Sequence, residues 1–195
     1  MIAESSTLFW ITSRAAGTTA MVFSSATVGV GLTMGGRLIK RGAAERRSLH
    51  EVLSLSVMVA IAVHGLSLLG DSYFHPGLLS VTVPFFASYD KLYTALGIIA
   101  GWGMIILGLS FYMRKHIGLN RWKVIHRSTA VAWLLGLVHC FTEGTDAGRT
   151  WFVALILGTA APALILLTVR LLRRRQPRLI RNEAAVVPRL SSPSA

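Results

Sequence analysis

Five apolar stretches of about 20 residues alternate with short polar segments along this chain of 195 residues. At 1.5 Å per residue, a helix of that length crosses the ~30 Å hydrocarbon layer of a bilayer. A chain in lipid must satisfy its own backbone groups, so such stretches fold as helices. Charged residues make up only 14% of the chain, against about 25% in soluble domains. The sequence therefore predicts an all-α, polytopic membrane protein, a helical bundle of about five transmembrane helices.

The predicted spans form one transmembrane domain over residues 1–172, and a basic tail follows over residues 173–195. The spans are expected at residues 8–36, 48–69, 92–113, 124–141 and 151–172. Residues 71–91 contain two prolines and are too broken to cross a membrane, so we expect an outer loop that can hold an interfacial helix. The Arg-rich, then Pro- and Ser-rich tail predicts a juxtamembrane anchor followed by disorder.

The 20 Lys and Arg residues outnumber the 8 Asp and Glu residues, and they are distributed asymmetrically. Basic residues gather in segments 37–47 and 114–123 and in the tail, whereas loops 71–91 and 142–150 hold one Lys and one Arg between them. The positive-inside rule places the basic segments in the cytoplasm and the N-terminus outside. The same rule accounts for the net charge of +12, because the basic segments would lie next to membrane lipid. We therefore do not expect nucleic-acid binding.

Four histidines lie inside two predicted spans, where an imidazole without a partner is costly. His50 and His64 are 14 residues apart in the second span, and His126 and His139 are 13 apart in the fourth. These spacings correspond to about 21 Å and ~20 Å along a helix. Because the two spans run in the same direction, His50 should lie at the depth of His126, and His64 at the depth of His139. Facing imidazoles are what bis-axial haem ligation needs, so the pattern predicts two b-type haems between the second and fourth spans.

The 13-residue spacing conflicts with a straight fourth span. At about 100° per residue, His139 falls roughly 140° short of the face of His126, whereas His64 falls only ~40° short of the face of His50. We therefore expect a kink or bulge in the fourth span near Gly136, or haems on different sides of that span.

Other roles for these histidines remain open. A buried histidine can be a hydrogen-bonded packing residue, and imidazole also binds zinc or copper. However, ligands ~20 Å apart cannot share one ion, and a two-ligand site is incomplete for either metal. Cys140 is the only cysteine, so neither an intramolecular disulfide nor a thiolate cluster can form from this chain. Glu51 is the only acid in a predicted span, which argues against transport driven by buried carboxylates.

Four segments around the histidines resemble the ferric reductase transmembrane domain superfamily, which includes ferric reductases, NADPH oxidases and bacterial single-domain members. They are RRSLHEVLSL at 46–55, YTALGII at 93–99, RWKVIHR at 121–127 and LVHCFTEGTDAGRTW at 137–151. Together with the histidine spacings, they extend the resemblance to the bacterial members over about residues 8–172. The resemblance implies a bacterial plasma-membrane protein in which His50 and His126 bind the cytoplasmic-side haem, and His64 and His139 the outer haem.

The resemblance also implies electron transfer across the membrane, from a cytoplasmic or membrane donor to an outer acceptor. The tail is too short for the flavin and NADPH domains fused in the oxidases, so we expect a separate redox partner, either a flavoprotein or reductase, or a quinol. Whether the chain is itself an oxidoreductase stays open. The alternatives are a haem-containing membrane anchor for a separate reductase, and a non-haem scaffold or transporter in which the histidines only pack.

Further candidates lie beside the four histidines. Haem propionates are anionic, so nearby arginines can pair with them, although positive-inside charge also explains each arginine. The tryptophan lies two turns past His126 and is expected either to fill the space between the haems or to pack in the core. These candidates are Arg46, Arg47 and Arg127 for the inner haem, Arg149 for the outer haem, and Trp133.

Several loop residues have two possible roles. An outer substrate site and simple solvation are both open for Tyr89, Asp90, Thr145 and Asp146. The remaining histidines, His75 and His116, lie in loops, where we expect them to be solvated.

Overall fold

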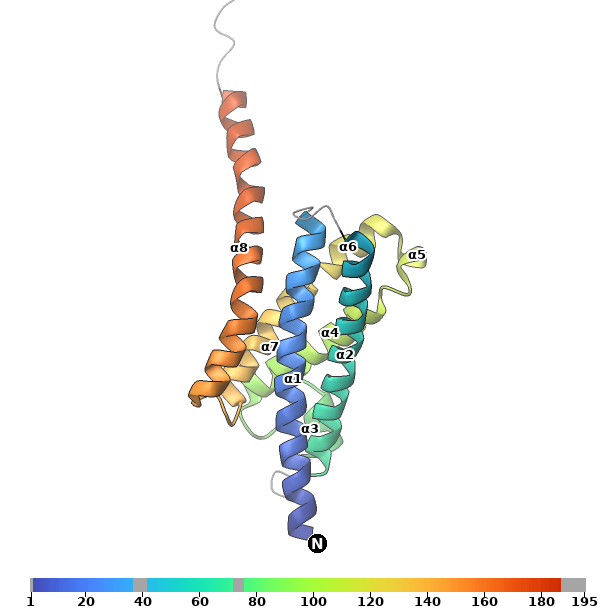
Figure 1. Ribbon diagram of the computed structural model, residues 1–195, viewed down its shortest axis with the longest axis vertical. Helices are drawn as coiled ribbons and strands as arrows, with labels where there is room; N and C mark the ends of the chain where they lie inside the picture. The colour runs from blue at the N-terminus through green and yellow to red at the C-terminus, as the bar shows by residue number, and fades with distance from the viewer. Residues whose placement is uncertain (1, 37–41, 72–75, 187–195) are drawn as a thin grey trace, which may run out of the picture.

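The computed structural model describes residues 2–36, 42–71 and 76–186, with side chains described over 7–36, 42–71 and 76–173. These residues form helices joined by turns and loops (Figure 1). The helices are α1 (Ile2–Gly36), α2 (Ala43–Leu69), α3 (Leu78–Thr82), α4 (Lys91–Leu109), α5 (Arg114–Ile117), α6 (Leu119–His126), α7 (Thr129–Glu143) and α8 (Thr150–Val186).

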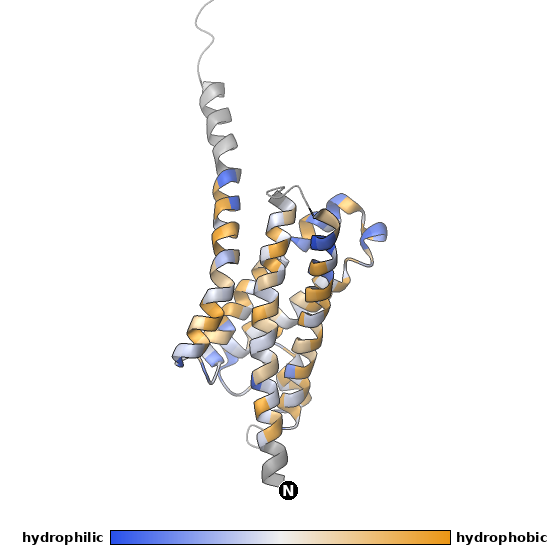
Figure 2. Cartoon of the chain, viewed as in Figure 1, coloured by the Kyte–Doolittle hydropathy of each residue, from blue (hydrophilic) through white to orange (hydrophobic). Residues whose placement is uncertain are grey.

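Five segments of the described chain are long and apolar enough to cross a membrane, which confirms the predicted all-helical fold and indicates an integral membrane protein. They are Thr7–Gly35, Ala43–Leu69, Lys91–Leu109, Leu119–Glu143 and Thr150–Arg173. Figure 2 shows apolar residues along the length of the bundle and most of the strongly hydrophilic residues near its two ends. Many large apolar side chains are exposed, including Leu66 and Val59 of α2 and Ile165 of α8. In a membrane, these side chains would face lipid.

The spans that contain α1, α2, α4 and α7 form a bundle in which α2 and α7 lie across from each other. α1 packs against α2, α7 and α8, and α4 packs against α7 and α2. Chain direction alternates from span to span, so α2 and the α6–α7 span run parallel, whereas α1 and α4 run opposite to them (Figure 1). α1 and α4 therefore each pack against both histidine-bearing helices.

The buried apolar core lies between α1, α7 and α8. Trp133 of α7 is its largest fully buried side chain, and Ile156 of α8 is fully buried beside it. Small residues let the helices approach closely, as is common in membrane bundles. For example, a Cβ at Gly29 of α1 would meet the Cβ of Ala163 on α8 at 4.0 Å. This core joins α7 and α8 to α1.

Outside the spans, the 71–91 segment agrees with the sequence prediction, whereas the tail differs from it. The 71–91 segment does contain a short helix, α3, and Trp102 of α4 donates a hydrogen bond from Nε1 to the carbonyl of Thr82 at 2.8 Å. α8 does not end at residue 172 but continues as a helix to Val186, where the sequence predicts a disordered tail. Leu, Arg and Gln are good helix formers, which favours this continuation.

The fourth span is distorted, although not at Gly136. The distortion follows His126, where Arg127 and Ser128 separate α6 from α7, and Gly136 lies inside the continuous α7. Hydrogen bonds from residue i to residue i−3 tighten the backbone here. They join the amides of Arg127, Ser128, Ala130 and Val131 to the carbonyls of Val124, Ile125, Arg127 and Ser128, at 2.9–3.2 Å.

This tight segment reduces the conflict in histidine spacing. A 3₁₀-like residue turns by about 120° instead of about 100°, so this segment brings His139 closer to the face of His126. The α6–α7 span can therefore present both imidazoles toward the same side.

Candidate cofactor site: two histidine pairs between α2 and α7

The four span histidines form two pairs, one near each end of the bundle. His50 of α2 and His126 of α6 have ring centroids 6.2 Å apart and an interplanar angle of 79°. Metal ions bind imidazole nitrogen at about 2.0–2.1 Å, so two imidazoles on opposite sides of one ion have centroids roughly 6 Å apart. At the other end of the bundle, His64 of α2 and His139 of α7 lie near each other. The structure thus brings together the residues that the spacing pairs by depth.

All four imidazoles are oriented by the same kind of contact, in which Nδ1 faces a backbone carbonyl of a neighbouring helix. On α1, Thr27 O lies 3.1 Å from His50 Nδ1, and Ser13 O lies 2.8 Å from His64 Nδ1. On α4, the corresponding distances are 3.3 Å from Leu107 O to His126 and 2.9 Å from Tyr93 O to His139. These four carbonyls are called the Nδ1 acceptors below.

The Nδ1 acceptors determine the tautomer of each ring. A carbonyl can only accept a hydrogen bond, so Nδ1 must carry the proton of the neutral imidazole and Nε2 keeps its lone pair. Within the described part of the chain, no residue forms a hydrogen bond with Nε2 of any of the four rings. A neutral imidazole whose Nδ1–H is bonded to a carbonyl is the form in which histidine ligates metals.

Glycines allow three of the rings to reach their acceptors. In a helix, the side chain at position i+4 covers the turn that carries the carbonyl of residue i. Gly17, Gly31 and Gly97 occupy this position relative to Ser13, Thr27 and Tyr93. A Cβ would lie 3.0 Å from His64 Nδ1 at Gly17, 3.1 Å from His50 Cε1 at Gly31 and 2.6 Å from His139 Nδ1 at Gly97.

The fourth acceptor, Leu107, needs no such glycine because α4 ends two residues later. Its carbonyl also accepts a hydrogen bond from Ser110 Oγ at 2.6 Å, and Ser110 Oγ accepts one from Trp122 Nε1 at 3.1 Å. Trp122 stacks on His126 with centroids 4.8 Å apart and an interplanar angle of 23°. Ser110 and Trp122 therefore support the acceptor and the ring of His126 together.

The acceptors and the glycines were not identified from the sequence, although one signal was present. Gly17 and Gly31 are 14 residues apart on α1, the same spacing as His50 and His64 on α2. Because α1 and α2 are antiparallel neighbours, equal spacing brings each glycine to one histidine. A glycine pair that repeats the histidine spacing on another span is thus a sequence signal for this arrangement.

The other predicted cofactor residues lie in different surroundings. Arg46, one turn before His50, is half-buried, whereas Arg47 and Arg127 are exposed at the same end of the bundle and Arg149 is exposed at the opposite end. Trp133 is only 1% exposed and donates a hydrogen bond from Nε1 to Ser25 Oγ of α1 at 3.0 Å. Trp133 therefore lies in the buried apolar core between α1, α7 and α8.

Asp146 is neither a solvated loop residue nor an exposed candidate for a substrate site. It is buried and forms an ion pair with Arg14 of α1, whose Nε lies 3.0 Å from Asp146 Oδ2. The Arg14 guanidinium also lies over the Trp10 ring, 4.1 Å from its centroid. Arg14 follows the acceptor Ser13, so the pair ties the His64 end of α1 to the loop after α7.

Asp146→Asn should lower the melting temperature of the purified protein in detergent, because the change weakens this charge-assisted contact. A double-mutant cycle with Arg14→Gln should give a coupling free energy of about 1–2 kcal/mol. Asp90→Asn, at an exposed position, is the matched control and should change the melting temperature little. A coupling near zero would show that Arg14 and Asp146 do not stabilise the protein as a pair.

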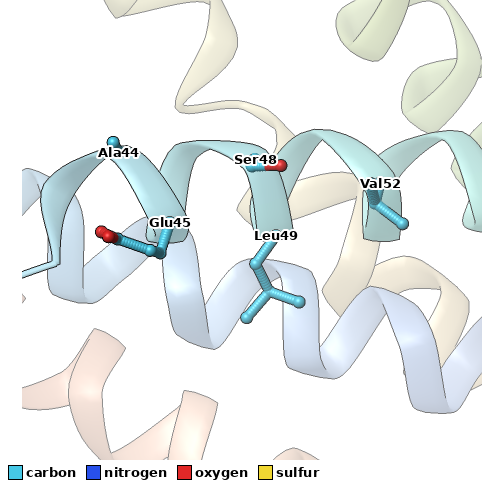
Figure 3. Close-up of a pocket in the computed structure, with 5 residues that line it drawn as sticks. All are labelled: Ala44, Glu45, Ser48, Leu49 and Val52. Carbon is cyan, nitrogen blue, oxygen red and sulfur yellow. The ribbon is translucent and has the colours of Figure 1, made fainter.

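The remaining loop candidates do not join the histidine pairs. Tyr89 and Thr145 are exposed, His116 is exposed on α5, and His75 lies outside the described residues. A shallow, open depression on the side of α2 contains none of the four histidines (Figure 3). It is lined by Ala44, Glu45, Ser48, Leu49 and Val52. The histidine pairs therefore remain the candidate site.

Comparisons with models of known protein families, with curated proteins and with solved structures found no match for this chain.

Proposed function

We propose that the chain is a membrane cytochrome of b type that transfers electrons across the bilayer through two haems. One haem is held by His50 and His126 and the other by His64 and His139. The observation that supports this most strongly is the shared state of the four rings, each with Nδ1–H on a carbonyl and a bare Nε2. The four rings are half-buried and none of the four Nε2 atoms is itself buried, so each Nε2 is open to a ligand.

The donor set favours haem over a metal ion bound directly by side chains. Among the described residues, no group of three or more His, Cys, Asp or Glu side chains could hold a metal ion. A structural zinc site needs four ligands from the protein. In a haem, the porphyrin nitrogens bind the iron, so the protein has to supply only the axial ligands. Haem iron with two axial histidines exchanges electrons between its ferric and ferrous states and leaves no open position for oxygen.

The protein contributes position and environment. The Nδ1 acceptors on α1 and α4 fix the rings, and the ~21 Å between His50 and His64 along α2 separates the two sites in depth. By the positive-inside rule, the end that carries Arg46 and Arg47 is cytoplasmic, and the N-terminus lies outside. Electrons then pass from a cytoplasmic or membrane donor, a flavoprotein or a quinol, to an outer acceptor in the plasma membrane of a bacterium. The resemblance to the ferric reductase transmembrane domain superfamily supports the same two ligand pairs.

An absorption spectrum tests the proposal. Protein purified from haem-replete cells should show the Soret and α bands of low-spin b haem, sharpened by dithionite, and two haems per chain in a pyridine haemochrome assay. A variant with alanine at His50, His64, His126 and His139 should show neither band. If the unaltered protein is folded and has no Soret band, the chain is a non-haem membrane protein in which the histidines pack.

A further inference from the structure

Ser13 contacts His64 through its side chain as well as its backbone. Its carbonyl lies 2.8 Å from His64 Nδ1 and its Oγ lies 3.0 Å from the same nitrogen. The hydroxyl also donates to the backbone carbonyl of His64 at 3.3 Å. With its own proton directed to that carbonyl, Oγ presents a lone pair to the Nδ1–H of His64. Ser13 is 3% exposed, so water does not compete for these contacts.

The equivalent residue at the other end of α1 does not do this. Thr27 is 14 residues after Ser13 and also offers its carbonyl to a histidine, His50. However, its Oγ1 donates to the carbonyl of Phe23 at 2.7 Å, within α1 itself. His126 and His139 likewise receive backbone carbonyls, from Leu107 and Tyr93. Among the four rings, His64 is the one with a side-chain acceptor at Nδ1 in the described structure.

We propose that Ser13 is a positioning residue that makes the His64–His139 site electronically different from the His50–His126 site. This inference rests on the proposed function. A second acceptor on Nδ1–H raises the electron density of the imidazole and makes Nε2 a stronger donor. A stronger axial donor stabilises the ferric form, so the Ser13 hydroxyl lowers the reduction potential of the haem at this site. The hydroxyl thereby distinguishes two sites whose histidines otherwise make the same Nδ1 contacts with backbone carbonyls.

Redox titration of the complete haem-loaded protein, followed at the α band, tests the role of Ser13. Ser13→Ala should raise the potential of one of the two components. At a fixed potential, the ratio of reduced to oxidised haem in that component should increase about threefold to tenfold, and tenfold corresponds to 59 mV for one electron. Ser24→Ala is the matched control, because the Ser24 hydroxyl is also buried on α1 but donates to the carbonyl of Met21 at 3.0 Å, and this variant should shift neither component. Ser13→Thr keeps a hydroxyl and should stay near the wild-type potentials.

The outcomes separate this inference from the proposed function. Two haems with unchanged potentials in Ser13→Ala, or the same shift in Ser24→Ala, would overturn the role of Ser13 alone. Loss of one haem in Ser13→Ala but not in Ser13→Thr would support the hydroxyl as a positioning group. Loss in both variants would assign the effect to packing and overturn it. Absence of haem from the wild-type protein would overturn the proposed function, and this inference with it.

Discussion

Replacing His126 with alanine should yield a protein that binds one haem instead of two. The change removes one imidazole of the pair whose ring centroids lie 6.2 Å apart, and it leaves His50 as a single axial ligand. The other pair lies about 20 Å away along the span, so its haem should remain and keep a low-spin spectrum. The measurement is the ratio of haem to protein by pyridine haemochrome assay, on material that elutes as a single species in size-exclusion chromatography. His50→Ala should give the same ratio.

The matched control is His116→Ala. His116 is exposed on α5, ten residues before His126, and its replacement should leave both haems in place. The combination of His126→Ala with His139→Ala should remove both haems, because one ligand is lost from each pair. Two haems retained in His126→Ala would show that the pairing is wrong. One haem retained in the double variant would show that the two haems do not share the α6–α7 span.

The five spans could be predicted because their signal is local. Length and hydropathy alone mark a segment that can cross a bilayer, and each predicted span lies within a candidate span or overlaps one closely. The closeness of His50 and His126 could be predicted for a related reason. A helix rises by a constant amount per residue, so depth on two parallel helices follows from residue number.

The position of the distortion in the fourth span could not be predicted in the same way. Glycine weakens helices in general, which pointed to Gly136. In the structure, Gly136 lies inside the continuous α7, where a Cβ would make an ordinary contact with the Cβ of Ala100 on α4, at 3.6 Å. The tight segment falls at Arg127 and Ser128, directly after the residue whose ring contacts Leu107 and Trp122. We infer that contacts with other helices set the position of this segment. Such contacts leave no residue pattern within the fourth span itself.

The groups that orient the ligands are nearly invisible in a sequence. A backbone carbonyl is present at every residue, so nothing in the identity of Leu107 or Tyr93 marks it as an acceptor. The ion pair of Arg14 and Asp146 joins residues 132 positions apart, and loop composition alone makes Asp146 look solvated. What the sequence does record is the absence of a side chain at Gly17, Gly31 and Gly97, where a methyl group would meet an imidazole.

Gly97→Ala should therefore displace His139 and weaken haem binding at the His64–His139 pair by at least about tenfold, the usual cost of disturbing a partner of a metal ligand. The added Cβ would lie 2.6 Å from both Nδ1 and Cε1 of His139, so the ring must leave the Tyr93 carbonyl. Alanine favours helix by about 1 kcal/mol over glycine, so α4 itself should not be weakened. Haem content measured across a haem titration should fall toward one per chain. Gly158→Ala in α8, where a Cβ meets nothing within 4 Å, should keep two haems. Unchanged haem binding in Gly97→Ala would mean that contact with the Tyr93 carbonyl does not hold His139 in its ligating orientation.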